Sequence, residues 1–79
     1  MDRAELLANL REIMSDQLAI DEEKIIESAS FVEDLGVDSL DLLQLVTAIE
    51  DELSIAIPDE AFENLSTVGD ALTIIEGLM

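Results

Sequence analysis

The 79-residue chain contains no cysteine and no histidine. These absences exclude disulfides, thiolate nucleophiles, Ser–His pairs and zinc sites with sulfur or imidazole ligands. Aromatic residues make up only 3% of the chain, so its core must be aliphatic. No run approaches the roughly 18 apolar residues that cross a membrane, and the first residues lack the basic and apolar regions of a secretory signal. We therefore expect a cytoplasmic protein without a metal site or membrane contact.

Basic residues are also scarce. Three of them against twenty acidic residues give a net charge of −17, which would repel nucleic acid and anionic lipid. Two interpretations of the acidity remain open: it attracts partners with basic surfaces, or it only maintains solubility. Because 49% of the residues are apolar, the chain should fold despite its charge. Its length predicts a single small domain spanning residues 1–79.

Apolar residues recur at helical spacing in three stretches, and no stretch shows the period of two that is typical of strands. The first helix is predicted from about Asp2 to Leu18 and the second from Ser39 to about Leu53. A short helix is predicted from Pro58 to about Asn64, with proline in its first turn. The last helix begins after Thr67 as N-cap, and its expected apolar stripe is Val68, Ala71, Leu72, Ile75 and Leu78. The fold class is therefore all-α, a small bundle of three longer helices plus one short helix.

The connection between the first two helices, residues 19–37, is long for so small a domain. Loops of this length are usually functional or anchored. Residues 21–24 predict a helical turn, and the expected apolar anchors are Phe31, Val32 and Leu35. These residues would fix the segment that leads the chain to its second helix.

The segment Gly36-Val37-Asp38-Ser39-Leu40-Asp41 predicts a loop that runs into a helix. Gly36 suits the final bend because glycine adopts positive φ without steric cost. Asp38 is expected to cap the helix, and Asp41 adds negative charge at the positive end of its dipole. The hydroxyl of Ser39, the first helical residue, should then face water, where a phosphate ester would lie near free N–H groups. Ordinary capping is the alternative interpretation of the Asp38-Ser39 pair.

The second predicted helix carries two apolar stripes, more than one buried face needs. The stripe expected to face the core is Leu42, Leu45, Val46, Ile49 and Leu53. The other stripe is Leu40, Leu43 and Thr47, rimmed by Asp41, Gln44, Glu50 and Asp51. This second stripe is either an exposed apolar strip beside Ser39 or a widening of the buried face.

Catalytic chemistry has little support in the sequence. Asp34, Asp38 and Asp41 suggest a calcium loop, but the acid spacing, central glycine and terminal glutamate of an EF-hand are missing. With 79 residues and no histidine, we expect no catalytic residues and no enzyme. The protein is expected to carry a chemical group rather than to convert one.

The sequence resembles the acyl carrier proteins of fatty-acid and polyketide synthesis. Asp38-Ser39-Leu40 matches the attachment motif of that family. The segment 31–36 is similar to its approach loop, and segments 50–53 and 57–60 are similar to the end of its second helix and the start of its third. The resemblance covers nearly the whole chain and includes the acidic composition.

The resemblance implies that a separate phosphopantetheinyl transferase attaches 4′-phosphopantetheine from coenzyme A to Ser39. The thiol of this group would hold acyl chains as thioesters, and Asp38 would assist recognition or metal binding during the transfer. Acyl-transfer and chain-elongation enzymes with basic patches would dock on Leu40, Asp41, Leu43, Gln44, Thr47, Glu50 and Asp51. Together with the periodicity, the resemblance implies an acyl-chain pocket lined by Leu45, Val46, Ile49, Phe62, Leu65, Ala71 and Ile75. We expect the carrier to be a monomer.

Three positions depart from the bacterial fatty-acid type. Gln44 replaces an acid, Thr47 a frequent methionine and Leu42 a small polar residue, which makes a specialised carrier an alternative to the housekeeping one. Asp38 argues against the peptidyl carriers, which more often have histidine before the serine. A D-alanyl or other aminoacyl carrier and an unmodified acidic interaction module remain the alternative functions.

Overall fold

The computed structural model describes residues 2–63 and 65–79, without the side chains of Asp59 and Phe62. Its elements are α1 (Arg3–Leu18), the 3-10 turn η1 (Glu22–Lys24), α2 (Ser39–Leu53), α3 (Asp59–Phe62) and α4 (Val68–Leu78). The predicted all-α bundle of three longer helices and one short helix is confirmed, and η1 forms where a helical turn was expected. The only β contact in the described part of the chain is an isolated bridge between Ser30 and Thr67.

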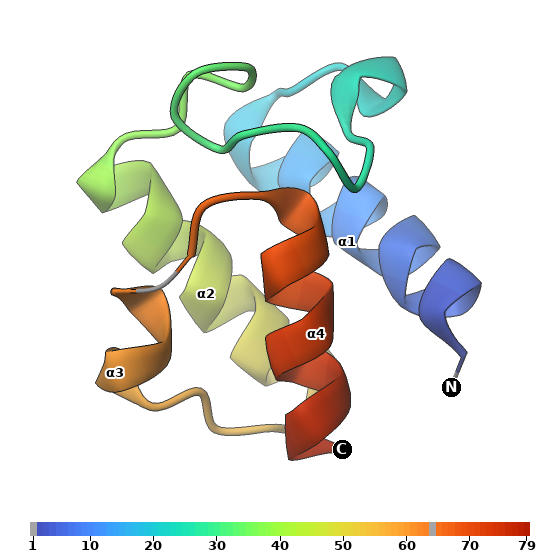
Figure 1. Cartoon of the computed structure of the whole chain (residues 1–79), viewed down its shortest axis with the longest axis vertical. Coiled ribbons are helices and arrows are strands. Elements are labelled where there is room, and N and C mark those ends of the chain that lie inside the picture. The colour runs from blue at the N-terminus through green and yellow to red at the C-terminus, as the bar shows by residue number, and fades with distance from the viewer. Residues whose placement is uncertain (1, 64) are drawn as a thin grey trace.

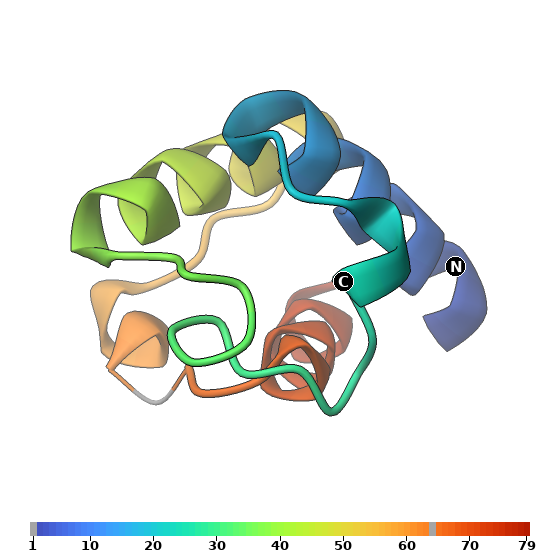
Figure 2. The same cartoon turned by 90° about the horizontal axis from the view of Figure 1, so that it is seen from above.

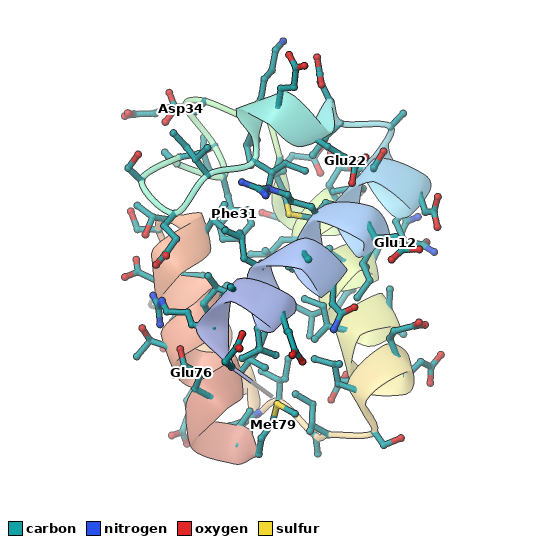
Figure 3. All side chains as sticks on the ribbon, turned by 90° about the vertical axis from the view of Figure 1, so that its right-hand side faces the viewer. Glu12, Glu22, Phe31, Asp34, Glu76 and Met79 are labelled. Carbon is teal, nitrogen blue, oxygen red and sulfur yellow. The ribbon has the colours of Figure 1, made fainter. Side chains whose placement is uncertain are left out.

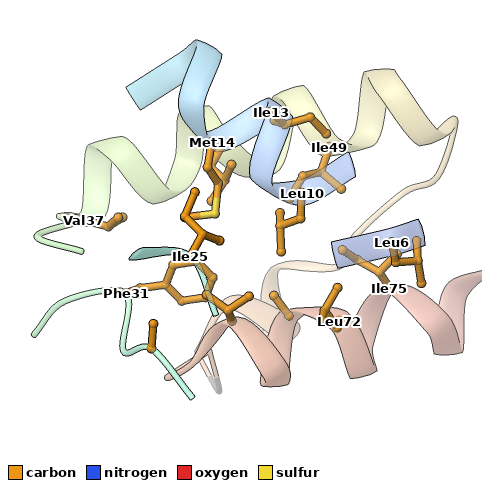
Figure 4. Packing of buried hydrophobic residues seen from close by; sticks show 14 residues of the cluster. Leu6, Leu10, Ile13, Met14, Ile25, Phe31, Val37, Ile49, Leu72 and Ile75 are labelled. Carbon is orange, nitrogen blue, oxygen red and sulfur yellow. The ribbon is translucent and has the colours of Figure 1, made fainter. Parts of the chain in front are cut away.

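The three longer helices surround one aliphatic core, and the connection between α1 and α2 crosses one end of the bundle (Figures 1 and 2). Figure 4 shows side chains from all three helices and from this connection meeting in the core. Its residues are Leu6, Leu10, Ile13, Met14, Ile25, Ala29, Phe31, Val37, Leu45, Ile49, Val68, Ala71, Leu72 and Ile75. Each large apolar side chain buried in this way contributes about 1.5–3 kcal/mol to folding.

Three expectations about individual residues were wrong. Val32 is 71% exposed instead of anchoring the connection, because the chain turns tightly at residues 31–35 and only Phe31 points fully inward. Leu78 is 38% exposed, since it is the last residue of α4 and lies next to the C-terminus. Pro58 is the N-cap of α3 rather than part of its first turn, and α3 ends at Phe62. The expected end near Asn64 lies outside the described residues.

Backbone hydrogen bonds join the connection to the start of α4. The N–H groups of Val68 and Gly69 donate to the carbonyls of Ala29 (3.0 Å) and Glu27 (2.8 Å), which satisfies two donors that a helix N-terminus leaves free. The absence of a side chain at Gly69 eases this approach, because a Cβ there would lie only 3.1 Å from the Glu27 carbonyl oxygen. Thr67 caps α4 as predicted, in a reciprocal capping box with Asp70.

Two of the three basic side chains hold the same connection. Arg11 donates to the carbonyl of Ile25 (2.8 Å). Arg3 contacts Glu27 (2.7 Å) and Glu76, and so ties the start of α1 to the connection and to α4. Hydrogen bonds to Glu27 and then to Glu76 raise the pKa of the Arg3 guanidinium above its usual value.

Candidate functional site

The functional segment predicted from the sequence forms the entry to α2. Gly36 has a φ of +66°, and no atom lies within 4 Å of where its Cβ would be, so the backbone angle and not lack of space favours glycine here. Asp38 caps the helix by accepting from the Asp41 N–H (2.8 Å). Only an electrostatic role was predicted for Asp41, but its carboxylate also accepts from the Asp38 N–H (3.4 Å) and completes a capping box.

Ser39 begins α2 and is exposed. Among the described residues, no partner engages its hydroxyl or the N–H groups of Ser39 and Leu40. A hydroxyl in this position is open to an enzyme, and the free N–H groups favour an anion attached to it. The expected orientation of Ser39 toward water is therefore confirmed.

A hollow of about 380 Å³ lies directly beside Ser39. Its lining residues are Phe31, Val32, Gly36, Val37, Asp38, Ser39, Leu42 and Leu65. Behind it, between α2 and α4, lies a cavity of only about 10 Å³, lined by Phe31, Leu42, Leu45, Val46, Ile49, Ile57, Leu65, Ala71, Ile74 and Ile75. Because Phe31, Leu42 and Leu65 line both, these three side chains separate the surface hollow from the apolar interior.

The small cavity brings together six of the seven residues predicted to line an acyl-chain pocket. The side chain of the seventh, Phe62, lies outside the described residues. Four further residues line the cavity without having been predicted to do so: Phe31, Leu42, Ile57 and Ile74. Leu42 could have been found from its place on the inner stripe of α2, whereas Ile57 lies in an irregular segment without a period to indicate its direction.

The second stripe of α2 faces solvent. Leu40 is 77% exposed and Leu43 is 58% exposed, so this stripe does not widen the buried face. Thr47 and Asp51 are exposed next to them. A shallow groove of about 440 Å³ follows these residues along α2. We call the set Leu40, Asp41, Leu43, Gln44, Thr47, Glu50 and Asp51 the outer face of α2.

Two polar residues of the outer face of α2 have structural contacts of their own. Gln44 donates from its amide nitrogen to the carbonyl (3.3 Å) and the side-chain oxygen (3.2 Å) of Gln17 at the end of α1. A carboxylate at position 44 could not donate in this way. Glu50 is only half-exposed and accepts from the Ile57 N–H (2.9 Å).

Acidic side chains point outward around the molecule, as Figure 3 shows for Glu12, Glu22, Asp34 and Glu76. In the part of the chain that the structure describes, no three potential ligand side chains converge on a metal position, so Asp34, Asp38 and Asp41 form no calcium loop. No helix in residues 2–63 and 65–79 has both the length and the apolarity to cross a membrane.

Comparison with known proteins identifies the family. A family model described as "Phosphopantetheine attachment site" matches residues 8–75. An acyl carrier protein of Thermosynechococcus vestitus is 47% identical over 75 residues, which cover 95% of this chain and 93% of that protein. The chain belongs to the acyl carrier protein family. A carrier from Sinorhizobium fredii is 45% identical over 73 residues, covering 92% and 94% of the two chains.

The fold of this carrier agrees with the same assignment. The crystal structure of an acyl carrier protein from Thermotoga maritima matches with a TM-score of 0.88 at 36% identity, covering 99% of this chain and 91% of that chain. The cofactor of the matched domain is phosphopantetheine. The entry to α2 fits such a group, since it offers a free hydroxyl, two free N–H groups for its phosphate, and an adjoining hollow.

Proposed function

We propose that this carrier holds acyl intermediates on 4′-phosphopantetheine attached to Ser39. The observation that carries the proposal is the free, exposed hydroxyl at the start of α2, next to a hollow that leads toward an apolar cavity. In the transfer, the serine oxygen forms a bond to phosphorus and loses its proton, while the nucleotide part of coenzyme A leaves. The chain contains no cysteine, so the thiol that forms the thioester comes from the attached group.

The cargo would be sheltered between α2 and α4. The cavity there is lined only by apolar side chains, which suits a hydrocarbon chain. A D-alanyl group carries an ammonium, and burying an unpaired charge in such a lining would be strongly unfavourable. The lining therefore favours acyl over aminoacyl cargo. Loading assays with acyl and aminoacyl ligases test this, and efficient loading by an aminoacyl ligase alone would contradict it.

Partner enzymes would dock on the outer face of α2. Leu40 and Leu43 offer exposed apolar contacts close to Ser39, and the acids Asp41 and Asp51 would attract basic residues on the partner. We propose that a phosphopantetheinyl transferase, acyl-transfer enzymes and chain-elongation enzymes use this surface in a fatty-acid, polyketide or specialised lipid pathway. The chain would act as a carrier and not as an enzyme. The cytoplasmic location and the monomeric state stay predictions.

The attachment is tested by incubating the protein with coenzyme A and a promiscuous phosphopantetheinyl transferase, followed by intact-mass measurement. The wild-type chain should gain the mass of one phosphopantetheine group, and Ser39→Ala should gain none. Ser28→Ala is the matched control, because Ser28 is also exposed but lies in the connection. A wild-type chain that gains no mass from a transferase active on another carrier would refute the proposal. If the chain is instead an unmodified interaction module, the protein purified from its native host will have an intact mass without a prosthetic group.

A further inference from the structure

The segment between α2 and α3 is held by one residue, Glu50. Its backbone carbonyl accepts from the N–H groups of Ser54 and Ile55, where α2 ends in a left-handed residue, Ser54, with φ 55°. Its carboxylate then accepts from the N–H of Ile57 (2.9 Å). Three N–H groups of this segment are thus bound by a single residue, and the next residue, Pro58, has no N–H to offer.

The segment that begins at Ile57 forms the weakest wall of the apolar cavity. Ile57 and Leu65 both line the cavity and lie on either side of α3. Apart from Phe31, the other lining residues belong to α2 and α4, helices of 15 and 11 residues with capping boxes. By contrast, α3 has four residues, and its N-cap, Pro58, provides no side-chain hydrogen bond. A cavity of about 10 Å³ holds about one water molecule, so a wall must move before an acyl chain can enter.

We propose that Glu50 is a positioning residue of the cargo cavity, and this inference rests on the proposed carrier function. Its carboxylate holds the Ile57 N–H and thereby keeps the wall at Ile57 closed against α2 and α4. The half-buried position of Glu50 fits this role, whereas Asp51 beside it is exposed. Among the described residues of the outer face of α2, Glu50 is the one whose side chain hydrogen-bonds to a cavity-lining residue, so it joins the docking surface to the cargo site.

The first experiment measures amide hydrogen exchange at Ile57 by NMR in the unmodified protein. Loss of a hydrogen bond to a charged acceptor in Glu50→Ala should accelerate exchange at Ile57 by about ten- to a hundredfold. Glu50→Gln keeps a neutral acceptor and should give an intermediate rate. Glu52→Gln, which removes the same charge two residues away, should leave Ile57 unchanged. Unaltered exchange at Ile57 in Glu50→Ala would overturn the proposal.

The second experiment uses the octanoyl-loaded protein and hydroxylamine, which cleaves thioesters that leave the shelter of the fold. Cleavage should be several-fold faster in Glu50→Ala than in the wild type, with partial rescue in Glu50→Gln. The matched control for stability is Glu27→Ala, which breaks the contact with Arg3, and neither of these residues lines the cavity. Equal cleavage rates in Glu50→Ala and Glu27→Ala would overturn the cargo role. Failure of Ser39 to take up the prosthetic group would instead refute the carrier function, and the exchange experiment would still report on Glu50 alone.

Discussion

Lengthening the acyl cargo should stabilise the carrier against heat, because the cavity between α2 and α4 would bury the added methylenes in the folded state only. Each buried methylene contributes about 0.8 kcal/mol, so extending butanoyl to octanoyl adds up to about 3 kcal/mol. In a domain of this size, 1 kcal/mol raises the melting temperature by roughly 4–8 °C. The figure is an upper bound, since the cavity starts at about 10 Å³ and opening its wall opposes the gain. The shortest chains should therefore have little effect.

The assay is calorimetric unfolding of the protein loaded with acetyl, butanoyl, hexanoyl and octanoyl groups. A variant that fills the cavity in advance, Ala71→Leu, should lose about 1–3 kcal/mol of stability when unloaded, because it overpacks a residue that is only 5% exposed. The melting temperature of Ala71→Leu should also rise less with acyl-chain length than that of the wild type. Ala29→Val is the control, since Ala29 is equally buried but does not line the cavity. Two results would refute the reasoning. One is a wild-type melting temperature that does not depend on the length of the acyl chain. The other is an equal rise in melting temperature per added methylene in the wild type and in Ala71→Leu.

Four further predictions concern the site, the core, the docking surface and the charge. Asp38→Ala should lower stability by about 1 kcal/mol in denaturant unfolding through loss of the cap. Asp38→Asn should retain the cap. If Ser39 is then modified more slowly in Asp38→Asn than in the wild type, the carboxylate itself has a role in the transfer. Equal rates of modification in the two proteins would exclude such a role. Leu72→Ala should cost about 2–5 kcal/mol because Leu72 is fully buried. Leu40→Ala should change stability by no more than about 0.5 kcal/mol but weaken partner binding measured by titration calorimetry. Raising ionic strength from about 0.01 to 0.15 M shortens the Debye length from about 30 to 8 Å. Because the chain has a net charge of −17, its melting temperature should rise. A constant or lower melting temperature would show that charge repulsion does not limit stability.

The sequence by itself determined the helices and the position of Ser39, because both depend on local interactions. Helical periodicity located α1, α2 and α4, and the side chains of Asp38 and Thr67 marked where two of them begin. A cap acts on N–H groups two or three residues away, so neighbouring residues alone are enough to reveal it. The same local pattern placed the exposed serine at the start of α2.

Only the tertiary structure decided which residues of the irregular segments are buried. The connection before α2 has no period, and so the sequence favoured Val32 as an anchor, whereas Ile25, Ala29 and Val37 are the residues that join Phe31 in the core. The contact of Glu50 with Ile57 was likewise decided only by the tertiary structure. Its helical position puts it on the outer face of α2, but its carboxylate meets the Ile57 N–H because the chain reverses after Ser54. Contacts between segments that approach only on folding leave no periodic signal in the residues that make them.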